Sequence, residues 1–217
     1  MVSREADEPR SHARMLVPLI DDLLRESGKE LGRICVDEGP GSFTGLRIGV
    51  STAKGLAWSL ELPLYAVPSL ALIAAGAVEA GYATEGLPLH VAISARAAEL
   101  FSASYVLKNG MLEEVDAPSV LESTDLLKRI AKGVIVPGSA SVRNDVEAAW
   151  QKQSDNSSAS QPTITPEIFP HSRFARTLLR NPAASYRVED VSSFEPRYMR
   201  AFVARKPAKS IFDRLPF

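Results

Sequence analysis

The chain has 217 residues, 45% of them hydrophobic, which is enough for one large or two small domains with a full core. Its 25 basic and 26 acidic residues give a net charge of −1, which excludes a globally basic nucleic-acid-binding protein. The single cysteine, Cys35, excludes an internal disulfide and a metal site built from several cysteines. It lies in the apolar run from Ile34 to Val36, which predicts a buried, unreactive thiol.

The first 80 residues alternate between helix and strand signals, and this order predicts an α/β fold with a partly parallel sheet. The uncharged run 62–78 approaches the length of a membrane span, but prolines and a glycine interrupt it, so a soluble, cytoplasmic protein is expected. Pro18 either kinks the first helix or lies in the first turn of a helix that begins near Val17. The expected elements are a helix near 11–26, a strand near 34–36, a long helix ending near 60, a strand over 64–67 and a helix capped at Ser69 and ending near 80.

Strand signals dominate after the predicted boundary region at 81–88, which divides the chain into domains over residues 1–84 and 85–217. The dipeptide Asn109-Gly110 is a strong hairpin signal. A serine-rich, weakly hydrophobic stretch within 151–162 predicts a flexible loop. The elements expected here are strands over 89–93, 99–107 and 111–120, a helix over 122–132, a strand over 134–136 and a helix around 145–151.

The most informative stretch is the glycine-rich turn and helix over residues 39–57. Small residues recur every four positions in that helix, so they form one ridge that another backbone can approach closely. The ridge consists of Gly45, Gly49, Ala53 and Ala57. A second reading concerns Gly39, Gly41 and Ser42, whose turn precedes a helix N-terminus and so is a candidate anion or nucleotide site. The spacing matches neither a P-loop, nor a dinucleotide-binding fingerprint, nor a serine-hydrolase elbow, which favours a structural turn.

The sequence GPGSFTGLRIGVSTAKGLA, from Gly39 to Ala57, resembles the signature of the bacterial tRNA threonylcarbamoyladenosine dimerization subunits, the TsaB family. Three weaker segments agree with it, at 11–20, 94–101 and 195–200. The chain departs from the family pattern at Ser94, where an aspartate is usual, and at Ala97-Ala98. It also begins roughly where the third strand of the family is expected. Either a misassigned start or a real truncation would account for this. A first sheet that lacks two strands would expose an edge.

The resemblance implies an actin-like, duplicated two-domain fold, shared with sugar kinases and heat-shock ATPases, whose first domain lacks its N-terminal strands here. It implies that the first helix and the glycine helix pair with the catalytic threonylcarbamoyltransferase paralogue (TsaD type), alongside a small ATPase subunit (TsaE type) and tRNA. ATP and metal would belong to the partner subunits, and this chain alone would bind no cofactor. Self-association through the same helices is a further expectation. The residues expected at the partner surface are Leu16, Leu19, Leu23, Thr44, Gly45, Arg47, Ile48, Gly49 and Ser51.

Catalytic residues are not predicted, because His12, His90 and His171 are isolated and lack the spacing that holds a metal on one helix face. The resemblance therefore implies a non-catalytic subunit of the complex that transfers threonylcarbamoyl from its adenylate to the tRNA adenosine beside the anticodon. An ATP-binding phosphotransferase or ATPase of the same superfold, and a glycoprotease-like peptidase, remain alternatives. The segment 197–217 carries six basic residues and one acidic residue among aromatic ones, which suits either RNA contact or a solvated tail.

Overall fold

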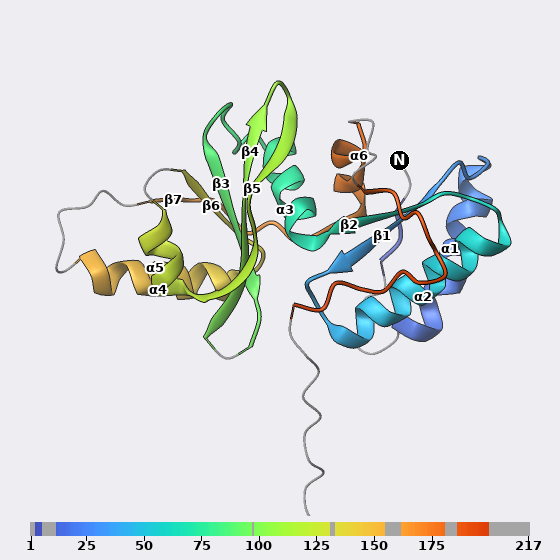
Figure 1. Cartoon of the computed structure of the whole chain (residues 1–217), viewed down its shortest axis with the longest axis horizontal. Coiled ribbons are helices and arrows are strands. Elements are labelled where there is room, and N and C mark those ends of the chain that lie inside the picture. Colours follow the sequence, from blue (N-terminus) through green and yellow to red (C-terminus); the bar gives the residue numbers. More distant parts are fainter. Residues whose placement is uncertain are drawn as a thin grey trace, which may run out of the picture.

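The computed structural model of the chain describes residues 3–5, 12–96, 98–130, 133–154, 162–180 and 186–199. Figure 1 shows two sheets lying next to each other, each with its own helices, and helix α3 between them. Most of the predicted mobile loop and all but the first three residues of the predicted basic tail lie outside the described residues.

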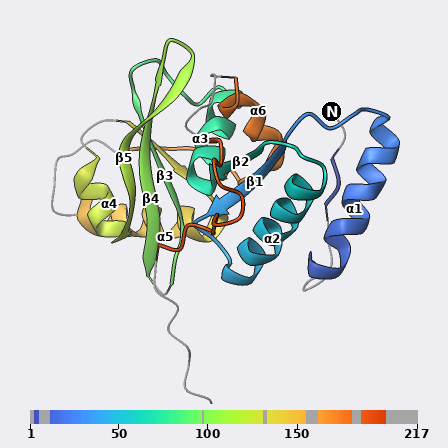
Figure 2. The same cartoon turned by 45° about the vertical axis from the view of Figure 1, so that its right-hand side comes forward.

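The first sheet has two described strands, β1 (Ile34–Gly39) and β2 (Leu64–Pro68), which pair in parallel from Ile34 opposite Leu64 onward. The connection between them is α2 (Phe43–Ser59), whose residues Leu46, Val50, Ala53 and Ala57 are buried. Helix α1 (His12–Ser27) precedes β1, and α3 (Ser69–Glu79) follows β2. Figure 2 shows α1 at the outer edge of this part of the molecule, beyond α2.

The second sheet has the strand order β5-β4-β3-β6-β7. Strands β3, β4 and β5 form an antiparallel meander, and β6 and β7 add to β3 in parallel. A core on one face joins this sheet to α3, where Leu70, Ile73 and Ala74 are fully buried. The strands are β3 (Pro88–Ser94), β4 (Glu99–Lys108), β5 (Met111–Glu122), β6 (Val134–Pro137) and β7 (Thr163–Ile164), and the helices of this half are α4 (Ser123–Arg129), α5 (Ala140–Ser154), the short 3₁₀ helix η1 (Ser172–Phe174) and α6 (Ala175–Leu178).

The two halves repeat one order of elements. The first runs α1-β1-α2-β2-α3 and the second runs α4-β6-α5-β7 before η1 and α6, and in both the two strands of the series pair in parallel. By this correspondence β1 matches β6, and β2 matches β7. The match stops at one place, because β6 has β3 on its second edge, whereas β1 pairs only with β2 among the described residues.

The closing segment, residues 186–199, returns from the second half and packs on the first sheet. The Val188 N–H donates to the Leu64 carbonyl at 2.9 Å, and the Arg197 N–H donates to the Glu38 carbonyl at 2.8 Å. Its side chains Val188, Val191 and Phe194 cover the small core around Leu64. The domain boundary at 84/85 stays a prediction, but this segment, assigned by that boundary to the second domain, lies against the first.

Most predicted elements are present, and three predictions about them need correction. Ser69 does not cap α3: its hydroxyl donates to Asp37, and the N-cap position is Pro68, with no side-chain bond. Helix α4 is shorter than predicted, ending at Arg129, and α5 is longer, beginning at Ala140. The missed start of α5 follows from Ser139, whose hydroxyl accepts the Val142 N–H at 3.4 Å and so caps the first turn. The hairpin at Asn109-Gly110 is confirmed, with φ of 52° and 73°.

Candidate functional site

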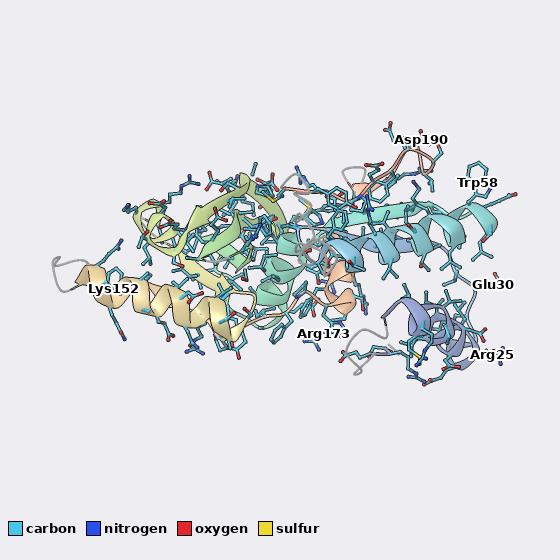
Figure 3. All side chains as sticks on the ribbon, turned by 90° about the horizontal axis from the view of Figure 1, so that it is seen from below. Arg25, Glu30, Trp58, Lys152, Arg173 and Asp190 are labelled. Carbon is cyan, nitrogen blue, oxygen red and sulfur yellow. The ribbon has the colours of Figure 1, made fainter. Side chains whose placement is uncertain are left out.

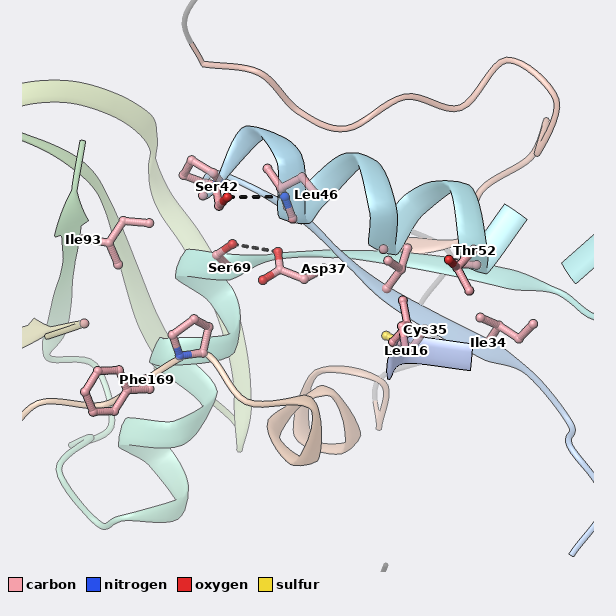
Figure 4. A pocket seen from close by; sticks show the side chains of 18 of the residues that line it. Leu16, Ile34, Cys35, Asp37, Ser42, Leu46, Thr52, Ser69, Ile93 and Phe169 are labelled. Atoms are coloured by element: carbon pink, nitrogen blue, oxygen red, sulfur yellow. Dashed lines mark hydrogen bonds between the residues drawn. The ribbon is translucent and has the colours of Figure 1, made fainter. Parts of the chain in front are cut away.

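A cavity of about 660 Å³ lies between the two halves, where the C-terminal end of β1 meets the first turns of α2 and α3 (Figure 4). The ends of parallel strands, followed by helix N-termini, commonly form the binding side of α/β folds. The second half contributes Ile93 and Ser94 from β3, together with Gly138 and Ser139 before α5. The floor at β1 and the wall at α1 and α2 are mostly apolar, and among the described lining residues Asp37 is the only charged one.

The glycine turn between β1 and α2 is held by its own hydrogen bonds. The Gly39 N–H donates to the Asp37 carboxylate at 2.8 Å, and the Ser42 hydroxyl caps α2 by accepting the Gly45 N–H at 3.3 Å. A Cβ on Gly39 would lie 2.9 Å from Leu46 Cδ1 and 3.2 Å from the Arg197 carbonyl oxygen, so close packing requires a glycine there. The backbone N–H groups of Gly39 and Gly45 are thus already hydrogen-bonded within the chain, and the Asp37 carboxylate lies beside the turn. The anion reading of Gly39, Gly41 and Ser42 stays a prediction, and this geometry favours the structural turn.

Asp37 is the acidic group that faces the cavity within the described part of the chain. Its Oδ1 accepts hydrogen bonds from the Ser69 hydroxyl at 2.7 Å and from the Gly39 N–H at 2.8 Å (Figure 4). Burial raises the pKa of Asp37 above its usual value, although these two hydrogen bonds lower it in part. The carboxyl therefore ties the end of β1 to the start of α3 at some electrostatic cost.

The substitution Asp37→Asn should raise the stability at neutral pH, because an amide oxygen accepts the same two bonds without a buried charge. A carboxyl whose pKa is raised on folding binds its proton more tightly in the folded chain, so stability falls as pH rises through the folded pKa. The stability of the variant should match that of the wild type below the usual aspartate pKa of 3.8 and exceed it above the folded pKa, as measured by urea unfolding across pH.

Asp190→Asn is the control, for which the opposite change in stability is expected. Hydrogen bonds from the hydroxyls of Ser192 and Ser193 lower the pKa of Asp190 to about 2, so its charged form stabilises the fold above the usual pKa and this stability is lost as pH falls toward 2. Removing that charge should weaken the chain at neutral pH. The same direction of change in both variants would contradict the assignment at Asp37.

The small-residue ridge of α2 passes from the small core to the cavity. Ala53 and Ala57 are buried against the first sheet, and Ala53 also lines the cavity together with Gly45 and Gly49. A Cβ on Gly49 would find its nearest neighbour, Val36 Cγ2, at 3.8 Å, an ordinary contact distance. Within the described residues the ridge is therefore not closely packed at Gly49.

Helix α1 presents its apolar stripe to the same region but does not bury it. From Arg14 to Ser27, the part of α1 whose burial is described, no residue is fully buried. Leu16 lines the cavity, and Leu23 lines an adjoining hollow of about 590 Å³ at the other end of β1. Figure 3 shows α1, marked by Arg25, and α2, whose far end is marked by Trp58, and the two helices contact each other.

The remaining predicted partner residues fall on two other faces of α2. Arg47 contacts the closing segment: its Nε donates to the Tyr198 hydroxyl at 3.1 Å, and its guanidinium stacks over Phe43 at 4.4 Å. Lys54, on the same side, donates to the carbonyls of Ser192 and Phe194. Sequence reasoning missed this closing segment as a neighbour of α2, since no local signal links positions about 140 residues apart.

The outward face of α2 is formed by Thr44, Ile48, Ser51 and Gly55, which helical spacing aligns in one row. Thr44, Ser51 and Gly55 are exposed, and Ile48 is half-buried. A Cβ added to Gly55 would meet nothing within 4 Å. On α1, Leu19 is half-buried and lines neither the cavity nor the adjoining hollow.

The prediction that Cys35 is buried is wrong, because the residue is exposed in β1, which pairs with β2 alone among the described strands. Desolvation by the surrounding chain and the nearby Asp37 charge nevertheless raise its pKa to about 12, so little thiolate is present at neutral pH. The unreactive character that the sequence predicts is therefore consistent with its surroundings.

The histidines within the described side chains are engaged in local structure. The His90 ring shares a hydrogen bond of 2.9 Å with the Ser104 hydroxyl inside the second sheet, and His171 lies 2.9 Å from the Glu5 carboxylate. No group of three or more potential metal ligands occurs in the described ranges. Over the same ranges, no helix has the length and apolar character needed to cross a membrane.

Comparison with known families gives one matching model, described as tRNA N6-adenosine threonylcarbamoyltransferase (TsaD), over residues 6–157. Among curated proteins, the chain is 39% identical over 109 residues to a tRNA threonylcarbamoyladenosine biosynthesis protein TsaB from Bacillus subtilis, covering 49% of this chain and 45% of that protein. It is 38% identical over 118 residues to the protein of the same name from Escherichia coli, covering 52% and 50%. The chain thus spans about half the length of the curated relatives it matches.

Solved structures extend the similarity to most of the chain. A protein from Pseudomonas aeruginosa, described as uncharacterized with similarity to the peptidase YeaZ, superimposes with a TM-score of 0.71 at 26% identity, covering 92% of this chain and 89% of that one. A structure of YeaZ from Pseudomonas aeruginosa gives a TM-score of 0.67 over 88% and 85%. With the repeated order of elements, these matches confirm the predicted actin-like duplicated fold.

Proposed function

This chain belongs to the TsaB family of tRNA threonylcarbamoyladenosine biosynthesis proteins. On that premise we propose that it is a non-catalytic subunit, whose helices α1 and α2 bind a catalytic threonylcarbamoyltransferase of the TsaD type. That partner transfers threonylcarbamoyl from its adenylate to the tRNA adenosine beside the anticodon. A small ATPase subunit of the TsaE type completes the complex, ATP and metal are bound by the partner subunits, and tRNA is engaged through the complex.

The outward face of α2 carries this proposal. Thr44, Ser51 and Gly55 form a row of small, exposed residues, and a partner helix laid along them can approach the α2 backbone closely. On α1, the half-buried Leu19 is a further apolar residue that we assign to the partner surface. Arg47 supports the face from within the chain, because its contacts with Phe43 and Tyr198 fix the N-terminal end of α2.

The contribution of this subunit is binding free energy. A partner that is active in only one of its conformations is shifted toward it by whatever surface binds that conformation better. Asp37, an acidic group at the cavity, is consistent with a structural role, since its hydrogen bonds with Gly39 and Ser69 join elements of this chain. A pair of TsaB-type chains would use the same helices when the catalytic partner is absent.

The substitution Ser51→Trp tests the proposal. An indole on the row of small residues prevents close helix packing, so the affinity for the catalytic paralogue should fall at least ~100-fold, as measured by calorimetry and co-purification. The fold should persist, because Ser51 is exposed.

Ala148→Trp is the matched control, since Ala148 is an exposed position in the middle of α5, in the other half of the chain. It should leave the affinity unchanged. Equal affinities of the two variants, both folded by circular dichroism, would place the partner on a different surface.

A further inference from the structure

A second cavity, of about 640 Å³, lies where the closing segment passes the C-terminal ends of β1 and β2 and the first residues of β5. None of its described lining residues is shared with the cavity at Asp37. Its volume is in the range of small-molecule sites, about 300–1,000 Å³. One part of the lining is apolar and consists of Ala66, Pro68, Leu112, Val188 and Phe194.

The charged side chains of this lining carry an excess of negative charge. Within the described residues, four carboxyl groups face two guanidinium groups, so their net charge is −2. A cavity lined mainly by one sign of charge raises the local concentration of ligands of the opposite sign. The acidic residues are Glu38, Glu114, Glu189 and Asp190, and the basic residues are Arg187 and Arg197.

Glu38, at the end of β1, is the carboxylate of this cavity that most needs a further partner. Its side chain is only 19% exposed, and burial raises its pKa above the usual value, although the nearby Arg197 charge lowers it in part. The Arg197 guanidinium lies 4.0 Å from the Glu38 carboxylate, at the outer limit of an ion pair. The charge of Glu38 is therefore poorly compensated by Arg197.

The Tyr105 hydroxyl gives a second, independent indication of a ligand. Tyr105 is 3% exposed, and its hydroxyl has no hydrogen-bond partner among the described residues. It lies in β4 opposite Glu114 of β5. Burial raises its pKa, as do Glu114, Tyr186 and Glu38, whereas Arg197 lowers it, and these four neighbours all line the cavity. The unsatisfied hydroxyl is thus directed toward the charged part of this cavity.

The chemistry of these groups favours an organic cation. No set of three or more potential metal ligands occurs in the described ranges, so the carboxylates are not arranged for a metal ion. A primary ammonium group carries three hydrogen-bond donors. It can therefore satisfy two carboxylates and one phenol oxygen together, while the apolar part of the lining accommodates methylene groups.

We propose that this cavity, the Glu38 cavity, binds an aliphatic diamine, with one ammonium group held by Glu38, Glu114 and the Tyr105 hydroxyl oxygen. The second ammonium group lies toward Glu189 at the exposed end, so that the two positive charges match the net charge of the lining. The Arg197 side chain is 49% exposed and can move toward solvent when the ligand enters. The cavity is separate from the outward face of α2, so this inference does not rest on the proposed partner.

The test titrates the full chain with 1,4-diaminobutane and follows the backbone amide signals by NMR. The signals of Glu38, Glu114 and Tyr105 should shift with saturation. The monoamine 1-aminobutane should bind about tenfold more weakly, and the uncharged 1,4-butanediol should cause no saturable shift. Absence of saturable binding of the diamine, or equal binding of the diamine and the monoamine, overturns the proposal.

Two glutamate variants locate the diamine. Glu38→Gln should weaken its binding about tenfold or more, because the amide keeps the shape of the side chain and removes the buried charge. Glu122→Gln removes an exposed carboxylate from the other end of β5 and should leave the binding unchanged. Equal weakening by both variants would show unspecific attraction to negative charge and overturns the proposal.

Tyr105→Phe separates ligand binding from a structural role of the hydroxyl. Removal of an unpartnered buried hydroxyl should not lower the free energy of unfolding of the chain alone. The same substitution should weaken diamine binding about tenfold, because the ammonium loses an acceptor. Unchanged diamine binding overturns the assignment of Tyr105, and so does a loss of stability in the chain alone, which would show that the hydroxyl already has a partner.

Discussion

Gly133→Ala is expected to lower the free energy of unfolding by about 3 kcal/mol or more. Gly133 has φ of +133°, a conformation that side chains rarely adopt, and its added Cβ would lie 2.6 Å from the Pro88 carbonyl oxygen and 2.9 Å from His90 Nε2. The obstacle is backbone at the start of β3, which cannot move without breaking its pairing with β6. Urea unfolding followed by circular dichroism measures the loss.

The control for this prediction is Gly110→Ala in the β4–β5 hairpin. Gly110 also has a positive φ, of +73°, but its Cβ would meet nothing within 4 Å. Gly110→Ala should lower the free energy of unfolding by only about 1 kcal/mol, because the positive φ is unfavourable for alanine but no atom is in the way. Similar losses at the two positions would show that the approach of Pro88 to Gly133 is looser than the structure has it.

Gly76→Ala is the second substitution with a large expected effect. It should destabilise the protein, although helix propensity alone would predict stabilisation. Within a helix, alanine is normally favoured over glycine by about 1 kcal/mol. At Gly76, however, the new Cβ would lie 2.6 Å from Ile168 Cγ2 and 2.7 Å from Phe174 Cε2, both from residues buried in the main core. Overpacking of this kind typically costs 1–3 kcal/mol, so the melting temperature should fall by several degrees.

Gly55→Ala gives the matched comparison, since Gly55 lies in α2 with open space around its Cβ position. Here the propensity gain is unopposed, and the chain should be stabilised by up to about 1 kcal/mol. Differential scanning calorimetry of the pair separates packing from propensity. If both substitutions stabilise the chain, η1 and residues 166–170 can move away from α3 without a cost in free energy, which contradicts the prediction.

Local signals in the sequence were sufficient for most of the elements. The hairpin at Asn109-Gly110 depends on two adjacent residues that tolerate positive φ, and it was predictable for that reason. The role of Ser69 was not predictable, because the sequence suggests an N-cap of α3, whereas the hydroxyl donates to Asp37, 32 positions earlier. A side chain that chooses between a local and a distant partner cannot be assigned from its neighbours in sequence.

The candidate site was predictable in its elements and not in its arrangement. The spacing of Gly45, Gly49, Ala53 and Ala57 correctly indicates one face of a helix, yet only the structure shows that this face passes from the core at Ala57 into the cavity at Gly49. Cys35 was predicted to be buried from its apolar neighbours, but it is exposed in a strand that pairs on one edge only within the described residues. Whether an apolar run lies inside a sheet or at its border depends on strand order, which periodicity does not encode.

The closing segment has a consequence for the order in which the molecule forms. Leu64, at the centre of the first small core, is covered by Val188, Val191 and Phe194, more than 120 positions later in the chain. Contacts of such long sequence separation close late, and during synthesis the second sheet, whose meander is local, emerges before the segment that seals the first. The half of the molecule that is made first is therefore the half that is finished last.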